Sequence, residues 1–258
     1  MGAVFARPAD AGTDGFWDLY SRYYDAIYQL MPYRKLLWDT FQALDLRPGM
    51  RVLDAGCGTG NFEAFIAEKD PPAIEVEAID FSPRMLQVAR KKCDRLGAYT
   101  FSQADLNQPL PFADASFDRV LSINVLYALD DPGATMGEFT RVLKPSGRLV
   151  LTSPRPSFRI IPLLADHFGR VRNIWGLRRK VEAVLRSISV LLTTGIAQVA
   201  MSSIVINGRE ADGTYRSLDR EEVAELLERF RLDGLARYDV GWSFAGQNVF
   251  ATAVKAAA

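Results

Sequence analysis

A short apolar run that leads directly into three closely spaced glycines constrains this sequence more than any other feature. The run is Val52-Leu-Asp-Ala-Gly-Cys-Gly-Thr-Gly60, with glycines at positions 56, 58 and 60. Glycine adopts positive φ readily and lets a ligand approach the backbone. A helix that begins after such a loop also offers free N–H groups and the positive end of its dipole. The segment therefore predicts a strand, a tight ligand-binding turn and a helix N-terminus, in that order.

The segments after this turn alternate between strand and helix patterns, which favours an α/β fold. Ser82 is placed to cap a helix whose first residue is Pro83, a favoured position for proline. This alternation predicts a parallel sheet with helices on both faces, and such sheets bind ligands at the carboxyl ends of their strands. We expect strands at 51–55, 74–79, 99–103, 117–123 and 148–152, and helices at 61–68, 83–96 and 132–142.

Further helical and strand patterns flank this alternation. An aromatic-rich stretch at 16–43 is interrupted by Pro32 and is expected to form two helices. A second helical stretch at 154–200 breaks the alternation. After it we expect a hairpin at 207–214, a helix at 219–230 and strands at 235–240 and 248–254.

These patterns also predict how the chain is divided. We expect a flexible arm at 1–15, a core at 16–153, an inserted segment at 154–200 and the completion of the core at 201–258.

Composition excludes some classes of protein. The 31 Lys and Arg residues balance 31 Asp and Glu residues, so net charge provides no attraction to nucleic acid. Two cysteines are too few for a disulfide scaffold, and the N-terminus lacks an apolar signal core, so we expect a cytoplasmic protein. The longest uncharged run, 187–208, carries too many polar side chains to favour a membrane span.

Two classes of nucleotide-binding loop compete for the glycine run. A dinucleotide fold requires G-x-G-x-x-G, but here Asn61 stands where the third glycine would fall. The run DAGCGTG at 54–60 instead resembles the first motif of class I S-adenosylmethionine-dependent methyltransferases, particularly those acting on small molecules, quinones or lipids. This resemblance implies S-adenosylmethionine as cofactor. It also implies a Rossmann-like, seven-stranded, mostly parallel sheet with an N-terminal helical cover and a helical lid after the fifth strand.

Later segments resemble the same family in the same order. Asp80 ends the second strand, where the family holds both ribose hydroxyls with an acidic residue, although an acidic residue there also fits NAD. Asp105 follows the third strand, Phe117-Asp118 begins the fourth, and the 141–147 segment leads into the fifth. The cofactor-binding residues that the resemblance implies are Asp54, Gly56, Cys57, Gly58, Gly60, Asp80, Phe81, Met85, Asp105, Leu106 and Asn124. The aromatic N-terminal stretch resembles a Y-Y-D-x-x-Y segment that closes over the cofactor, which adds Tyr24 or Tyr28.

The chemistry implied is transfer of the sulfonium methyl group to an N, O, S or C nucleophile. The protein then mainly aligns donor and acceptor, and a base is needed only when the nucleophile must lose a proton. The candidate catalytic residues are His167, the only histidine, and Tyr127, which stands where many relatives carry a histidine. Cys57 is interpreted as a small apolar filler, and we identify no metal site.

The inserted segment at 154–200 lies where this family builds its substrate lid. It carries eight basic residues against two acidic ones, for a local charge of +6, among many Leu, Ile and Val residues. We expect it to shape an apolar acceptor pocket with a cationic rim, suited to a small amphiphilic or anionic acceptor, and to allow peripheral membrane contact. A solvated arginine face over a buried helix is an equal alternative.

Three other functions compete with methyl transfer. The first is a nicotinamide-dependent oxidoreductase, against which Asn61 and the later motifs count. The second is a non-catalytic module that binds S-adenosylmethionine or a protein partner. The third is another reaction that uses the same cofactor. Asp80, Asp105 and the intact glycine loop argue against loss of the cofactor site, but they do not decide between catalysis and binding alone.

Overall fold

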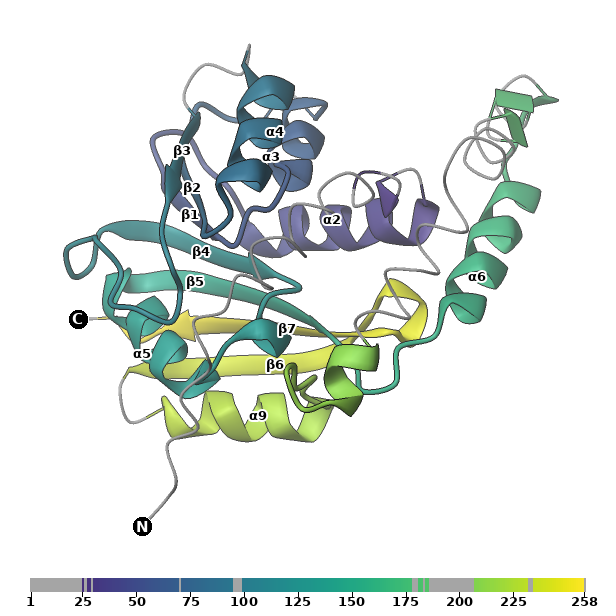
Figure 1. Ribbon diagram of the computed structural model, residues 1–258. Coiled ribbons are helices and arrows are strands. Elements are labelled where there is room, and N and C mark those ends of the chain that lie inside the picture. The colour runs from purple at the N-terminus through teal and green to yellow at the C-terminus, as the bar shows by residue number, and fades with distance from the viewer. Residues whose placement is uncertain are drawn as a thin grey trace.

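The protein is a sheet covered by helices on both faces, with one helix extending away from it (Figure 1). The computed structural model describes residues 25, 27, 28, 30–69, 71–94, 99–177, 181, 182, 184, 185, 207–231 and 234–257. The helices are α2 (Met31–Leu44), α3 (Asn61–Ala67), α4 (Pro83–Cys93), α5 (Pro132–Val142), α6 (Ile160–Arg172) and α9 (Arg220–Arg229). Two short 3-10 helices are η1 (Leu126–Ala128) and η2 (Phe244–Gly246).

A single seven-stranded sheet forms the centre, in the order β3-β2-β1-β4-β5-β7-β6. Its strands are β1 (Arg51–Ala55), β2 (Glu75–Asp80), β3 (Tyr99–Gln103), β4 (Phe117–Ile123), β5 (Leu143–Pro154), β6 (Leu235–Ser243) and β7 (Asn248–Lys255). The pairs from β3 to β5 are parallel, whereas β7 is antiparallel to both β5 and β6. The predicted seven-stranded, mostly parallel sheet is therefore confirmed, with its switch in strand order between β1 and β4.

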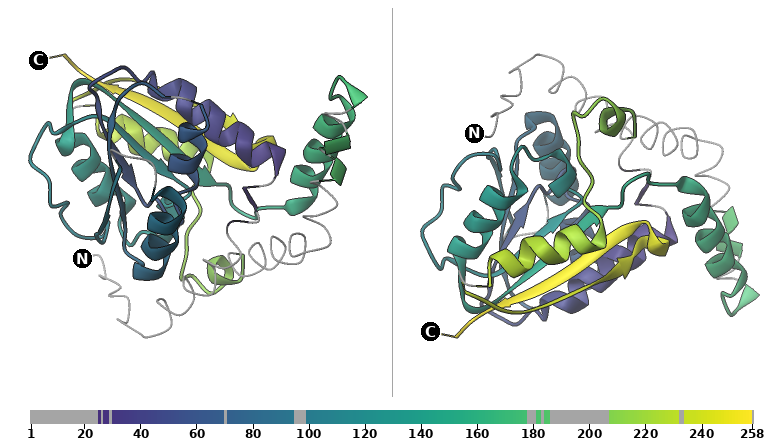
Figure 2. Two further views of the ribbon diagram at one scale, coloured as in Figure 1. Left: turned by 90° about the horizontal axis from the view of Figure 1, so that it is seen from above. Right: turned by 90° about the horizontal axis from the view of Figure 1, so that it is seen from below.

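Successive residues of a strand pack against different helices, which shows which helices cover each face of the sheet. Val52 packs in a cluster with α2, α3 and α4, while the next residue, Leu53, packs in a second cluster with α5 and α9. Leu149 and Val150 of β5 divide between the clusters in the same way. Because consecutive strand residues point to opposite faces, this pattern buries both faces of the sheet (Figure 2).

Several local predictions hold, and two are corrected. Helix α4 begins at Pro83, and Ser82 Oγ accepts the N–H of Met85, as the capping signal predicts. The hairpin predicted at 207–214 is wrong: residues 207–211 are helical, because a short polar stretch carries no period that separates a turn of helix from a strand. Strand β5 starts at Leu143 rather than at 148, with an irregular register before Arg148 and a positive φ of 62° at Ser146.

Helix α6 extends away from the sheet and is anchored at α2 (Figures 1 and 2). Leu163 is fully buried in the cluster that contains α2, and His167 Nδ1 accepts the N–H of Met31 at 3.1 Å. That bond satisfies one of the N–H groups that the first turn of α2 leaves without a helical partner. Among the described residues, no helix combines the length and apolarity that crossing a membrane requires. The described part of 154–200 is helical at 160–172, 177, 181, 182, 184 and 185, while its role as a lid stays a prediction.

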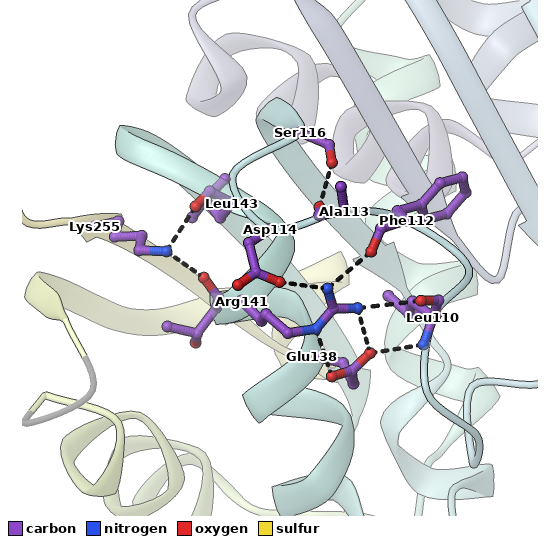
Figure 3. Close-up of polar contacts among 10 residues, drawn as sticks. Leu110, Phe112, Ala113, Asp114, Ser116, Glu138, Arg141, Leu143 and Lys255 are labelled. Atoms are coloured by element: carbon purple, nitrogen blue, oxygen red, sulfur yellow. Dashed lines mark hydrogen bonds and ion pairs between the residues drawn. The ribbon is translucent and has the colours of Figure 1, made fainter.

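Arg141 at the end of α5 fixes the loop between β3 and β4 (Figure 3). Its guanidinium donates to the backbone oxygens of Phe112 and Leu110, at 2.8 and 3.1 Å, and to Asp114 Oδ1 at 2.8 Å. It also forms two bonds to Glu138, at 2.8 and 2.7 Å, and Glu138 Oε2 accepts the N–H of Leu110 at 2.6 Å. These bonds to Arg141 hold the pKa of Glu138 below its ordinary value.

Replacement of Arg141 by Ala is expected to lower the free energy of unfolding by about 2 kcal/mol, since it removes several charge-assisted hydrogen bonds. Because the pKa of Glu138 is lowered, its contribution is present above the ordinary Glu pKa and is lost as pH falls, so the difference from the parent protein shrinks in acid. Urea unfolding at several pH values measures this. The matched control is Arg231→Ala, which removes an exposed ion pair to Glu228 at 3.2 Å and is expected to cost less than about 1 kcal/mol. Equal losses in both variants would contradict a special role for Arg141.

Candidate functional site

The glycine loop after β1 has a backbone that only glycine adopts without strain. Gly56, Gly58 and Gly60 have φ values of 89°, 55° and 74°. A Cβ on Gly56 would lie 2.3 Å from Val125 Cγ2, and one on Gly60 would lie 3.1 Å from Ala89 Cβ. The first glycine therefore permits close approach to the loop after β4, and the third permits close packing on α4. These positions match the predicted tight turn, and ligand binding by it stays a prediction.

The parallel pairing of β1 and β2 places this loop beside Asp80. Ala55 lies opposite Ile79 in the register, and the N–H groups of Gly56 and Cys57 donate to the Ile79 oxygen at 2.8 and 3.0 Å. The Gly58 N–H donates to Asp80 Oδ2 and the Ser82 N–H donates to Asp80 Oδ1, each at 2.9 Å. Burial raises the pKa of Asp80, although these backbone donors oppose the rise. Asp80 is thus an oriented acceptor at the carboxyl end of β2.

Two acidic residues lie buried behind the loop. Asp54 near the end of β1 and Glu63 in the first turn of α3 are 2% and 0% exposed. Burial raises the pKa of both, and each carboxyl group also affects the pKa of the other. Cys57 is also buried, and burial raises the pKa of its thiol, which suits the predicted role of a small filler rather than a nucleophile.

The residues predicted to surround the adenine follow β2 and β3. Met85 is buried in α4, and Phe81 is half-buried, with its backbone oxygen accepting from Gln103 Nε2 at 2.9 Å. The Ala104 N–H donates to the backbone oxygen of Asp80 at 3.1 Å, which joins the end of β3 to the end of β2. Asp105 is exposed and accepts the Asn107 N–H at 2.9 Å, whereas Leu106 is buried. Both strand ends thus converge at the sheet edge that carries the loop.

Asn124, at the end of β4, has the left-handed backbone that marks many functional positions. Its φ is 59°, and its Oδ1 accepts from Thr152 Oγ1 at 3.1 Å and from Asn248 Nδ2. Sequence reasoning missed Thr152 and Asn248. Thr152 ends a predicted strand, so the rule about strand ends could have identified it. Asn248 begins β7, and only the antiparallel pairing of β7 with β5 brings it here.

The two predicted catalytic residues occupy different surroundings. Tyr127 in η1 is buried and makes an edge-to-face contact with Tyr215, with ring centroids 5.4 Å apart. His167 accepts the Met31 N–H through Nδ1, so its neutral ring carries the proton on Nε2, and burial lowers its pKa. In this arrangement the ring binds α2 rather than offering a basic nitrogen, and its catalytic role stays a prediction.

The N-terminal aromatic segment reaches the glycine loop through Asp25. Lys92 Nζ on α4 donates to Asp25 Oδ1 and Asn61 Oδ1, each at 2.7 Å, and to Thr59 Oγ1 at 3.3 Å. The Thr59 hydroxyl also donates to Asp25 Oδ1 at 2.6 Å. This contact joins three segments that sequence spacing does not relate.

The two tyrosines predicted to approach the cofactor differ in what the structure says of them. The Tyr28 hydroxyl donates to Glu68 Oε1 at 2.7 Å, while Tyr24 lies outside the described residues. A role of either tyrosine at the cofactor stays a prediction. Across the described ranges, no three His, Cys, Asp or Glu side chains are grouped so as to hold a metal ion.

Comparison with known proteins relates this geometry to a family. The family described as "Methyltransferase domain" matches residues 46–200. The demethylmenaquinone methyltransferase of Tropheryma whipplei (strain Twist) is 40% identical over 108 residues, covering 42% of this chain and 43% of that protein. Methyltransferase GfsG of Streptomyces halstedii is 37% identical over 114 residues, covering 43% of this chain and 40% of that protein. The matched part thus spans less than half the length of these curated relatives.

Solved structures share the fold over a longer stretch. A putative S-adenosyl-L-methionine-dependent methyltransferase from Methanococcus maripaludis aligns with a TM-score of 0.55 at 16% identity, covering 100% of this chain and 99% of that one. The CurJ carbon methyltransferase aligns with a TM-score of 0.55 at 17% identity, covering 87% of this chain and 53% of that one. With the glycine loop, Asp80 and the family match, these findings lead to one assignment: the chain belongs to the class I S-adenosylmethionine-dependent methyltransferases.

Proposed function

We propose that this protein transfers a methyl group from S-adenosylmethionine to an apolar or amphiphilic small molecule, anionic acceptors included. The observation that carries the proposal is the pairing of the positive-φ glycine loop with Asp80, at the carboxyl edge of the sheet where such folds bind nucleotides. When bound, the cofactor supplies a methyl group activated by its own sulfonium charge. The residues of the chain then have to bind, orient and exclude water.

Asp80 is suited to hold a vicinal diol. An ionised carboxylate has about four acceptor positions. Gly58 and Ser82 use one on each oxygen, and the Phe81 backbone also acts on the group, so the carboxylate is oriented and keeps acceptor capacity. Two parallel acceptors at a fixed orientation match the two hydroxyls of a ribose. The backbone donors also hold the carboxylate in its charged form, which opposes the effect of burial.

Alignment of donor and acceptor is the main contribution that we assign to the protein. Asn124 follows β4 and bonds to Thr152 near the end of β5, and we assign this side of the site to the acceptor. The buried Tyr127–Tyr215 pair supports an acceptor with an apolar or aromatic body. Among the relatives, the demethylmenaquinone methyltransferase is named for an acceptor of that kind.

We also propose peripheral membrane contact through 154–200. Around α6 and after it, Ile161, Trp175 and Leu177 are 76%, 94% and 82% exposed, in a segment that carries Arg170 and Arg172. Exposed apolar side chains beside arginines match the interface of an anionic bilayer.

A cytoplasmic location is supported by the two cysteines, Cys57 and Cys93, which are both free thiols.

Replacement of Asp80 by Ala is expected to weaken S-adenosylmethionine binding at least about 30-fold, since it removes two hydrogen bonds to a charged acceptor. Asp80→Asn keeps one acceptor oxygen and is expected to lose less affinity. Calorimetric titration with S-adenosylmethionine, S-adenosylhomocysteine and NAD measures this. Binding of NAD, or of none of the three, would overturn the proposed cofactor. Binding that persists without turnover across an acceptor screen would favour the non-catalytic module.

Replacement of Gly56 by Ala is expected to lower the free energy of unfolding by about 2 kcal/mol and to abolish cofactor binding, because it adds a Cβ at positive φ against Val125. The matched control is Gly169→Ala in α6, where a Cβ meets nothing within 4 Å and helix propensity should raise stability by up to about 1 kcal/mol. Urea unfolding and the same titration check both. An unchanged Gly56 variant would remove the steric argument for this loop.

Replacement of Trp175 by Ala is expected to reduce flotation of the full chain with vesicles of phosphatidylcholine and phosphatidylglycerol, since an exposed indole favours the bilayer interface. Trp38→Ala on α2, whose side chain is 43% exposed, is the matched control and should leave flotation unchanged. Absence of flotation by the parent protein on both anionic and neutral vesicles would exclude the membrane proposal while leaving methyl transfer untouched.

A further inference from the structure

The buried carboxyl pair behind the glycine loop forms no ion pair with a described cationic side chain. Asp54 Oδ1 and both carboxyl oxygens of Glu63 are fully enclosed, and no N–H or O–H group of another residue donates to them. Within the described part of the chain neither side chain takes part in an ion pair. After burial, the other carboxyl group has the largest effect on the pKa of each, so the two groups lie side by side.

A hydrogen bond between two carboxyl groups requires a proton. Two carboxylates side by side in a buried site do not both ionise readily, so burial favours a state with one shared proton and one negative charge. This arrangement avoids the cost of burying two unpaired charges. Burial is the largest cause of the raised pKa of both groups, and for Asp54 the charge of Glu63 comes next.

The titratable groups around the pair come from every neighbouring element. Asp80 faces it from β2, Cys57 from the loop, Cys93 and Lys92 from α4, and Tyr99 from β3. The positive charge of Lys92 lowers the pKa of Glu63 without a hydrogen bond, because its amine donates to Asp25, Thr59 and Asn61. Asp25 balances the charge of Lys92. The glycine loop is therefore backed by net negative charge.

We propose that Glu63 is a positioning residue that shares a proton with Asp54 and lets the negative charge behind the glycine loop increase when a cationic ligand arrives. The proposal rests on the proposed function, because S-adenosylmethionine carries a sulfonium charge that its thioether product lacks. The site would then bind S-adenosylmethionine more tightly than S-adenosylhomocysteine. An approaching cation stabilises the doubly ionised pair, so binding is coupled to loss of the shared proton to solvent.

The test is calorimetric titration of the full chain with S-adenosylmethionine and S-adenosylhomocysteine, in buffers of equal pH and different ionisation enthalpy. The parent protein should release a measurable fraction of a proton on binding the cofactor and less on binding the product. Its affinity for the cofactor should rise with pH by up to about tenfold per unit while the pair titrates. Parent titrations that show cofactor binding with no proton release would overturn the proposal and leave the proposed function standing.

Two variants separate proton sharing from packing. Glu63→Gln keeps a hydrogen-bond partner for an ionised Asp54 but removes the shared proton, so proton release and the pH dependence of affinity should both disappear. Glu63→Leu leaves Asp54 buried without a donor, so Asp54 should become neutral, and the preference for cofactor over product should fall by about tenfold. Glu225→Gln, at an exposed position on α9, is the matched control and should match the parent protein. Glu63→Gln with the proton release of the parent protein would overturn the proposal.

A measurement without cofactor tests the pair on its own. Because the pKa of the pair is raised in the folded state, its contribution to stability is complete at low pH and is lost as pH rises through the folded value. The free energy of unfolding of the parent protein should therefore fall relative to Glu63→Gln as pH rises above the ordinary carboxyl range. A constant difference between the two proteins would contradict proton sharing, even if S-adenosylmethionine did not bind at all.

Discussion

Parallel pairing of β1 with β2 sets Ala55 opposite Ile79, and the rest of the site depends on this register. It brings the N–H groups of Gly56 and Cys57 to the Ile79 oxygen and the N–H of Gly58 to Asp80. A shift of one residue would turn every side chain of β1 to the other face, which would expose Asp54 to the wrong helix layer and remove Asp80 from the loop. The close packing of Gly60 on Ala89 holds the register from the helix side.

The two helix layers each contain a glutamate, and the pKa values of these two glutamates shift in opposite directions. Glu138 on α5 lies partly in solvent, is bonded to Arg141, and has a lowered pKa. Glu63 on α3 is fully buried beside another carboxyl group and has a raised pKa. The first arrangement contributes to the stability of a loop. The second reduces stability at neutral pH, and such a cost is typical of groups that serve a site rather than the fold.

Much of this organisation follows from local sequence. The strands at 51–55, 99–103 and 117–123 and the capped helix after Ser82 match the predictions because each carries its own period or capping residue. Asp80 could be found because it follows a strand. Asn248 and Tyr215 could not, since they reach the site only through the antiparallel return of β7 and the segment after α6. Glu63 looks like an ordinary acidic residue in the first turn of a helix, and only its burial distinguishes it.

The hydrogen bond between His167 and Met31 links α6 to the N-terminal end of α2, two helices that lie outside the strand–helix alternation. Met31 begins α2, which follows the segment that carries Asp25 and Tyr28. His167 belongs to α6, at the start of the segment that we assign to the acceptor. A hydrogen bond to the N-terminus of α2 therefore fixes the acceptor side of the protein relative to the segment that reaches the glycine loop. Because burial lowers the pKa of His167, the ring stays neutral at physiological pH and this link is preserved. The described contact of this histidine is therefore a geometric one, and its role in proton transfer stays a prediction.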